Sequence, residues 1–190
     1  MNIFSGLEKI VEENYPLAKM TWYGLGGPAD YFITPENTDQ LKEAVSRCNE
    51  NDIPVKVLGF GSNLLISDEG VKGAVVKLKG EEFEKTEFNQ DKVTAWAGAN
   101  LGKLVRECVQ KELSGLEACT GIPGSVGGAV RMNAGGRFGD IGSSIKSVTV
   151  MDIEGNVFEK SKPELSFDYR SSNIAAAFIL NAKMHMYEGD

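Results

Sequence analysis

Residues 121–142 have the sequence Gly-Ile-Pro-Gly-Ser-Val-Gly-Gly-Ala-Val-Arg-Met-Asn-Ala-Gly-Gly-Arg-Phe-Gly-Asp-Ile-Gly, which holds eight of the 22 glycines in the chain. Glycine accepts positive φ and leaves its amide open to a ligand, but it costs roughly 0.5–1 kcal/mol against alanine in regular structure. A ligand that binds only the folded chain offsets such a cost, and glycine-rich turns bind phosphates through their backbone amides. We therefore expect a pyrophosphate-bearing cofactor along this stretch. The alternative, a plain surface turn, needs only one or two glycines.

A second glycine-rich loop, Gly-Phe-Gly-Ser-Asn-Leu-Leu, occupies residues 59–65. It lacks the third glycine of a Rossmann fingerprint, and no amphipathic helix is expected after it. No Walker phosphate loop occurs in the sequence, and Pro123 stands where a nucleophile elbow at Ser125 would need its first glycine. Two serine-containing glycine loops, about sixty residues apart, predict one extended anionic ligand gripped from two sides. The two loops should therefore face each other across a cleft.

Composition limits the classes of protein that fit this sequence. The 190 residues are 42% hydrophobic and 25% charged, which suits one soluble domain or two small ones with a buried core. A net charge of −7 without a basic cluster argues against nucleic acid and anionic membranes as partners. No apolar run approaches the roughly 18 residues of a membrane span. The N-terminus also lacks the layout of a signal peptide.

The cysteine and histidine content argues against several kinds of site. Cys48, Cys108 and Cys119 are odd in number and widely spaced, which fits free thiols in a reducing cytoplasm and not a disulfide framework or a structural zinc. His185 is the only histidine, so a Ser-His-Asp site or a multi-histidine metal site is not expected. We predict a cytoplasmic protein without a metal.

Apolar spacing and capping residues predict helices and strands in two groups. Helices are expected over residues 4–14, 38–51 and 101–111, the last one capped by Asn100. Strands are expected at 31–34, at 55–58 as a buried strand, at 74–78, 148–152, 157–160 and 177–186, with a hairpin formed by 83–88 and 93–96. The charged break Lys79-Gly80-Glu81-Glu82 divides the chain into subdomain 1, residues 1–79, and subdomain 2, residues 80–190. This pattern predicts a two-part α+β fold.

Four motifs in the chain resemble the UDP-N-acetylenolpyruvoylglucosamine reductase family, also called UDP-N-acetylmuramate dehydrogenase. The motifs are Gly59–Leu65, Gly121–Ala129, Met132–Gly135 and Tyr169–Ser172. Thr21 and the run Gly26–Asp30 match the N-terminal signature of that family, and the resemblance spans about residues 19–188 in matching order. It implies the two-subdomain FAD-binding fold of vanillyl-alcohol-oxidase (PCMH) type flavoproteins.

The same resemblance implies which residues form the site. The residues expected to line FAD are Gly59, Phe60, Gly61, Ser62, Asn63, Leu64, Leu65, Gly121, Ile122, Pro123, Gly124, Ser125, Gly127, Gly128, Ala129, Asn133, Ala134 and Gly135. Arg170 matches the active-site arginine of the family, and Tyr169 with Arg170 should contact the substrate. A guanidinium can hold a carboxylate on which negative charge develops during hydride addition. Without the motif, Arg170 would be interpreted as a surface arginine.

The activity implied by the resemblance belongs to peptidoglycan synthesis, and hence to cell-wall biogenesis, cell shape and cell division. NADPH would be the hydride donor to the flavin, and UDP-N-acetylglucosamine enolpyruvate would be reduced to UDP-N-acetylmuramate. The family has a third, substrate-binding domain with a proton-donating serine and a glutamate. We expect this chain to end before that domain and to be inactive alone.

Several alternatives stay open at this stage. A flavin-binding module without catalysis and another small flavoprotein oxidase of the same fold would carry similar loops. Arg131 and Arg137 could reach a phosphate or lie in solvent. The sequence does not decide the oligomeric state.

Overall fold

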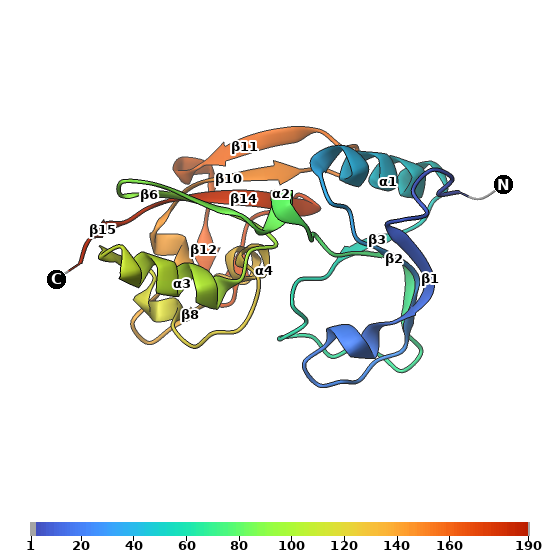
Figure 1. Ribbon diagram of the computed structural model, residues 1–190, viewed down its shortest axis with the longest axis horizontal. Helices are drawn as coiled ribbons and strands as arrows, with labels where there is room; N and C mark the ends of the chain where they lie inside the picture. The colour runs from blue at the N-terminus through green and yellow to red at the C-terminus, as the bar shows by residue number, and fades with distance from the viewer. Residues whose placement is uncertain (1–2, 190) are drawn as a thin grey trace.

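The computed structural model describes residues 3–189, and its largest sheets follow one another along the chain (Figure 1). The first sheet has the order β1-β2-β4-β3. Its strands are β1 (Val11–Pro16), β2 (Pro28–Ile33), β3 (Val55–Val57) and β4 (Val71–Val76). β1 is antiparallel to β2, whereas β2, β4 and β3 run parallel to one another. The 3₁₀ helix η1 (Leu17–Met20) and the helix α1 (Thr38–Glu50) connect these strands.

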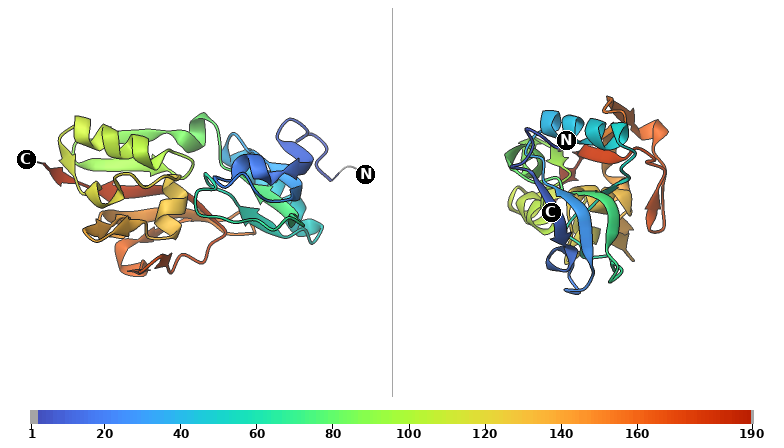
Figure 2. Two further views of the ribbon diagram at one scale, coloured as in Figure 1. Left: turned by 90° about the horizontal axis from the view of Figure 1, so that it is seen from below. Right: turned by 90° about the vertical axis from the view of Figure 1, so that its right-hand side faces the viewer.

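The second sheet is antiparallel throughout and has the order β11-β10-β14-β6-β5. Its strands are β5 (Thr86–Asn89), β6 (Lys92–Trp96), β10 (Ile145–Met151), β11 (Val157–Ser161) and β14 (Phe178–His185). The other elements are α2 (Glu81–Glu84), α3 (Leu101–Gln110), β7 (Leu113–Ser114), η2 (Glu117–Cys119), α4 (Val126–Arg131), β8 (Gly135–Gly136), β9 (Gly139–Asp140), η3 (Ile141–Ser143), η4 (Lys162–Glu164), β12 (Phe167–Asp168), β13 (Ser171–Ser172) and β15 (Tyr187–Glu188). Figure 2 shows the two sheets at opposite ends of the long axis.

The two longer helices begin at polar caps: Asn100 is the cap expected from the sequence, whereas α1 is capped by Asn37 and not, as its sequence suggests, by Thr38, because Thr38 is its first helical residue. The side chain of Asn37 caps α1 by accepting from the amide of Gln40 at 2.9 Å, and that of Asn100 caps α3 by accepting from the amide of Lys103 at 2.8 Å. Each helix buries one apolar stripe. The buried residues are Leu41, Ala44, Val45 and Cys48 in α1 and Leu101, Leu104, Val105 and Cys108 in α3. Burial raises the pKa of the Cys48 and Cys108 thiols to about 11, so both behave as small hydrophobic side chains.

One hydrophobic core joins the two sheets. Ile33 and Val76 of the first sheet belong to the same buried cluster as Leu104 of α3 and Val148 of β10. A smaller cluster joins residues of the first sheet, such as Phe32, to Leu17 of η1 and to Leu58 after β3. The strands of the first sheet all precede residue 79 and those of the second all follow residue 80. Because residues from both sides of positions 79 and 80 share this core, a division into subdomains at these positions remains a prediction.

Three local expectations were wrong. The segment 4–14 is not helical, because its end forms β1 and pairs with β2 from Val11 to Pro16, and this pairing overrides the helical spacing of the apolar residues. The strand β3 is a sheet edge and not a buried strand, so Val57 is 44% exposed. The stretch 121–142 is not a continuous loop, because it contains the helix α4. Glycine is a poor helix former, and Gly127 and Gly128 concealed that helix.

The expected hairpin is present as β5 and β6, and the strands expected at 148–152, 157–160 and 177–186 correspond to β10, β11 and β14. Within residues 3–189, the structure contains no helix with the length and apolar character needed to span a bilayer. In Figure 1, α3 and α4 lie below the second sheet, with α4 against β14. This arrangement places the start of α4 beside the end of the first sheet.

Candidate functional site

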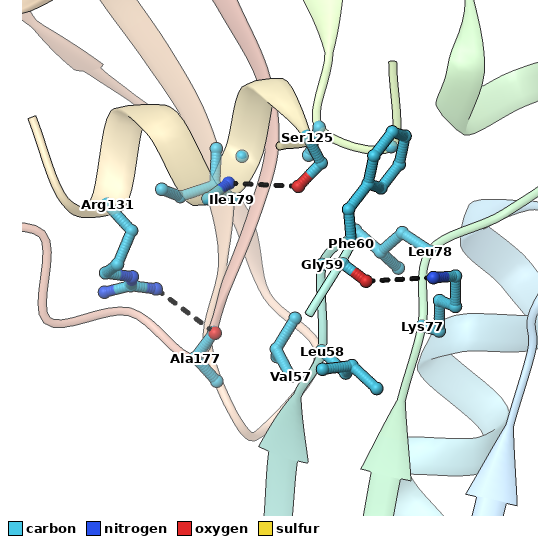
Figure 3. Close-up of a pocket in the computed structure, with 14 residues that line it drawn as sticks. Val57, Leu58, Gly59, Phe60, Lys77, Leu78, Ser125, Arg131, Ala177 and Ile179 are labelled. Atoms are coloured by element: carbon cyan, nitrogen blue, oxygen red, sulfur yellow. Dashed lines mark hydrogen bonds between the residues drawn. The ribbon is translucent and has the colours of Figure 1, made fainter. Parts of the chain in front are cut away.

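A cleft lies between the two glycine-rich loops, as the sequence predicts (Figure 3). Its free space, part of which is open to solvent, is about 580 Å³. The first sheet and its loops contribute Val57, Leu58, Gly59, Phe60, Lys77 and Leu78. The second part of the chain contributes Ala97, Gly98, Ser125, Gly127, Gly128, Arg131, Ala177 and Ile179. The cleft is therefore built from both sheets.

Strand direction explains why the first set of residues meets at one edge. β3 and β4 run parallel and end at Val57 and Val76, so the residues that follow both strands leave the sheet on the same side. The amide of Leu58 donates to the carbonyl of Val76 at 2.8 Å, which keeps the two chain segments together beyond the strands. The loop that begins at Gly59 is thereby aimed at the start of α4.

The two loops are in direct contact. The hydroxyl of Ser62 donates to the carbonyl of Pro123 at 2.8 Å. A Cβ at Gly59 would lie 2.6 Å from the Oγ atom of Ser125, so a side chain cannot be accommodated there without movement. Ser125 is buried and caps α4, its Oγ accepting from the amide of Gly128 at 3.3 Å. The close approach leaves backbone and hydroxyl groups, rather than larger side chains, at this part of the cleft.

The cleft carries positive charge in a chain whose net charge is −7. Its described lining residues include two cations, Lys77 and Arg131, and no Asp or Glu. In Figure 3 these cations lie on opposite sides of Gly59 and Ser125. Burial lowers the pKa of the Lys77 ammonium and of the Arg131 guanidinium. The cleft therefore favours an anionic ligand.

The structure also settles the environment of the two arginines that the sequence left open. The guanidinium of Arg131 donates to the carbonyl of Ile174, to that of Ala176 at 2.7 Å and to that of Ala177 at 3.3 Å. It thus ties the end of α4 to the segment that leads into β14. Arg137 is exposed and lies 5.7 Å from the ring centroid of Phe138.

Fifteen of the 18 residues expected to line FAD fall into three groups. Those that line the cleft are Gly59, Phe60, Ser125, Gly127 and Gly128. Those beside it, in the two loops and α4, are Gly61, Ser62, Gly121, Ile122, Pro123, Gly124 and Ala129. The exposed residues at the end of the first loop are Asn63, Leu64 and Leu65. Contact of the last two groups with a cofactor stays a prediction.

Asn133, Ala134 and Gly135 follow α4 and are outside the cleft lining. Asn133 is buried; its Oδ1 accepts from the amide of Gly142 and its Nδ2 donates to the carbonyl of Asp168, both at 3.1 Å. Gly135 pairs with Asp140. These contacts give the motif a role in joining α4 to the hairpins beyond it.

The two residues expected to contact the substrate do not line the cleft. Tyr169 and Arg170 form the turn between β12 and β13, where Tyr169 is 90% exposed and Arg170 has φ of 58°. The turn is held against the end of α4, because the hydroxyl of Ser172 donates to the carbonyl of Arg131 at 3.0 Å. The role of Arg170 therefore stays a prediction.

The sequence interpretation missed several lining residues. Leu58, Lys77 and Leu78 had a usable signal, since each lies at the end of an expected strand and parallel strand ends meet at one edge. Ala177 and Ile179 had no local signal, because only the long-range pairing of β14 with β6 and β10 brings them to the cleft.

The site and fold together define a class of nucleotide-binding α+β protein. The close approach of the Gly59 backbone to the Ser125 hydroxyl, the two cations and the apolar wall with Val57 and Ile179 fit a ligand that has both a diphosphate and an apolar ring, as FAD does. A family model described as FAD binding domain matches residues 29–161, which is more than half of the chain. The protein therefore belongs to the FAD binding domain family.

Curated relatives and solved structures add to this assignment. The chain is 39% identical over 192 residues to a UDP-N-acetylenolpyruvoylglucosamine reductase from Clostridioides difficile (strain 630), a match that covers 100% of the chain and 62% of the relative. The crystal structure of a UDP-N-acetylenolpyruvylglucosamine reductase from Thermus caldophilus matches with a TM-score of 0.82 and 38% identity, covering 95% of this chain and 63% of that one. The chain thus spans about three fifths of the length of these relatives.

A more distant match concerns the fold alone. A chitooligosaccharide oxidase structure matches with a TM-score of 0.71 at 18% identity, and the match covers 98% of this chain and 43% of that one. The expected two-subdomain flavoprotein fold is confirmed by these neighbours together with the family match.

Proposed function

We propose that this chain is the FAD-binding part of an NADPH-dependent reductase that converts UDP-N-acetylglucosamine enolpyruvate to UDP-N-acetylmuramate. Relatives at 39–43% identity carry the corresponding name. The observation that carries the proposal is the cleft in which two glycine loops touch, with two cations and no carboxylate among its described lining residues. A division into subdomains at residues 79 and 80 and a location in the cytoplasm are part of this proposal.

The residues of the cleft would each bind a different part of FAD. Backbone amides of residues 59–62 and 124–125 would donate to the diphosphate, with the hydroxyl of Ser125 beside them, since the amides of residues 126–128 already donate within the chain. Apolar side chains such as Val57, Leu78 and Ile179 would cover a ring and exclude water. Bound FAD would supply hydride chemistry, accepting from NADPH and delivering to the enolpyruvyl double bond.

Arg170 would hold the carboxylate of the substrate. It is exposed, and the ion pairs formed within residues 3–189 involve other side chains, so its guanidinium is available for a bidentate contact with a carboxylate. Tyr169 lies next to it, with its ring centroid 5.7 Å from the guanidinium carbon. Such a contact would stabilise the charge that builds on the carboxylate as hydride adds.

The absorption spectrum of the purified protein tests the cofactor. We expect a yellow protein that releases FAD on denaturation. A colourless protein that also fails to take up added FAD would contradict the proposal.

Reduction experiments separate the alternatives. A flavin-binding module would not be reduced by NADPH, and an oxidase would reoxidise rapidly in oxygen and ignore UDP-sugars. The reductase proposal expects reduction by NADPH and perturbation of the flavin spectrum by UDP-sugars in a form of the protein as long as its relatives. We expect no steady turnover from residues 1–190 alone.

A further inference from the structure

Lys77 occupies an unusual position at the cleft. It follows β4 by one residue, and its amide donates to the carbonyl of Ile33 at 2.9 Å. Its side chain reaches across to the first glycine loop, where Nζ donates to the carbonyl of Gly59 at 2.9 Å and lies 5.5 Å from the ring centroid of Phe60. The lysine therefore links the end of the first sheet to the loop.

The ammonium of Lys77 has unused donor capacity. A half-buried lysine usually has an acidic partner, because desolvation of an unpaired charge is unfavourable. Within residues 3–189, no carboxylate lies within ion-pair distance of Lys77. One of its three N–H groups donates to Gly59, which leaves the others free to meet an anion in the cleft.

We propose that Lys77 is a positioning residue for the first glycine loop: its bond to the Gly59 carbonyl fixes the loop so that the amides that follow face the cleft, and its charge attracts the diphosphate of a bound flavin dinucleotide. The second half of this statement rests on the proposed FAD binding. The first half concerns the chain itself and is testable without a ligand. Arg131 has the corresponding place across the cleft, where it fixes the carbonyls of Ile174, Ala176 and Ala177.

The effect of pH follows from the charged groups around Lys77. Burial is the largest influence and lowers its pKa, Lys79 lowers it further and Glu84 raises it, while Arg131 lies on the other side of the cleft. An anion binds best to the protonated lysine, so FAD affinity should be highest below the pKa of Lys77 in the free protein. Affinity should then fall as pH rises through that pKa, before an exposed lysine would lose its proton.

The experiment compares four variants with the wild-type protein by titration with FAD, monitored by flavin fluorescence. Lys77→Met should weaken FAD binding about 10- to 100-fold, the range expected for a charged hydrogen bond. Lys77→Gln keeps a hydrogen-bond donor without the charge, so its FAD affinity should lie between those of the wild type and Lys77→Met. Lys77→Arg should stay within about fivefold of wild type and should lose less affinity at about pH 10. Lys79→Met, which removes the same charge two residues away, should stay within about twofold.

Amide hydrogen exchange in the flavin-free protein isolates the positioning role. Lys77→Met should speed exchange at residues 60–62 and leave the β5–β6 hairpin unchanged. If the wild-type protein binds no FAD but Lys77→Met still speeds exchange at residues 60–62, the proposed function fails and the positioning role stands. If Lys77→Met and Lys77→Gln fold and match wild type in both measurements, Lys77 has no such role. Failure of Lys77→Arg to bind better than Lys77→Gln would also overturn it.

Discussion

The two glycine-rich loops face the same cleft, but the fold uses their glycines differently. In the first loop, Gly61 has φ of +66° and lies against the carbonyl of Met20, so glycine permits a sharp change of chain direction. In the second, Gly127 lies inside α4, where a Cβ would come within 2.8 Å of the Ala97 Cβ. There glycine permits close packing of a helix against the segment after β6. Similar composition therefore need not indicate similar conformation.

Removing the glycine of the tightest approach should give the largest effect. Gly61→Ala combines a left-handed backbone with a collision against the Met20 carbonyl, and we expect a loss of about 3–5 kcal/mol in unfolding free energy. The matched control is Gly121→Ala in the second loop, which has φ of +77° but no heavy atom within 4 Å of its added Cβ. Gly121→Ala should lose about 1–2 kcal/mol of unfolding free energy, from backbone strain alone. Equal losses in denaturant titrations would show that backbone strain alone, and not close approach, sets the requirement at Gly61.

The anchor of the second region should give the next largest effect. Arg131→Leu removes the guanidinium that binds three backbone carbonyls, and we expect a loss of about 2–3 kcal/mol together with weaker FAD binding. Arg137→Leu is the control, since Arg137 is exposed beside Phe138, and should change stability by less than about 0.5 kcal/mol. Thermal and urea unfolding measure both variants. Similar stabilities for the two would mean that Arg131 does not hold the 174–177 segment.

The smallest effect is expected at the hydroxyl that caps α4. Ser125→Ala should cost about 1 kcal/mol through loss of the cap. It should also weaken FAD binding about 3- to 10-fold, because the hydroxyl lines the cleft. Asn37→Ala removes the cap of α1, away from the cleft, and should cost the same stability without changing FAD affinity. An equal loss of FAD affinity in Ser125→Ala and Asn37→Ala would show that Ser125 affects binding only through the stability of the fold.

Local chemistry was enough to predict part of the molecule. The cap at Asn100 and the apolar stripes of α1 and α3 are set by residues three and four apart, so the sequence displays them directly. The hairpin β5–β6 is likewise local. The pairing of the two glycine loops was predictable because both carry serine among glycines after an apolar segment.

The rest depends on contacts between distant residues. The strand β1 exists because β2 lies beside it, and its own spacing favoured a helix. The helix α4 is held by its Ser125 cap and by the packing of Gly127 on Ala97, although its glycines disfavour a helix. Lys77 looks like an ordinary lysine after a strand until the structure places Gly59 beside it.

The central claim is that both loops hold one flavin dinucleotide between them. Amide hydrogen exchange measured with and without FAD, on protein whose FAD stoichiometry is known, tests it most directly. The account predicts one FAD per chain and slower exchange both at residues 59–62 and at residues 124–125. Slower exchange in one loop only, or in neither despite bound FAD, would contradict it.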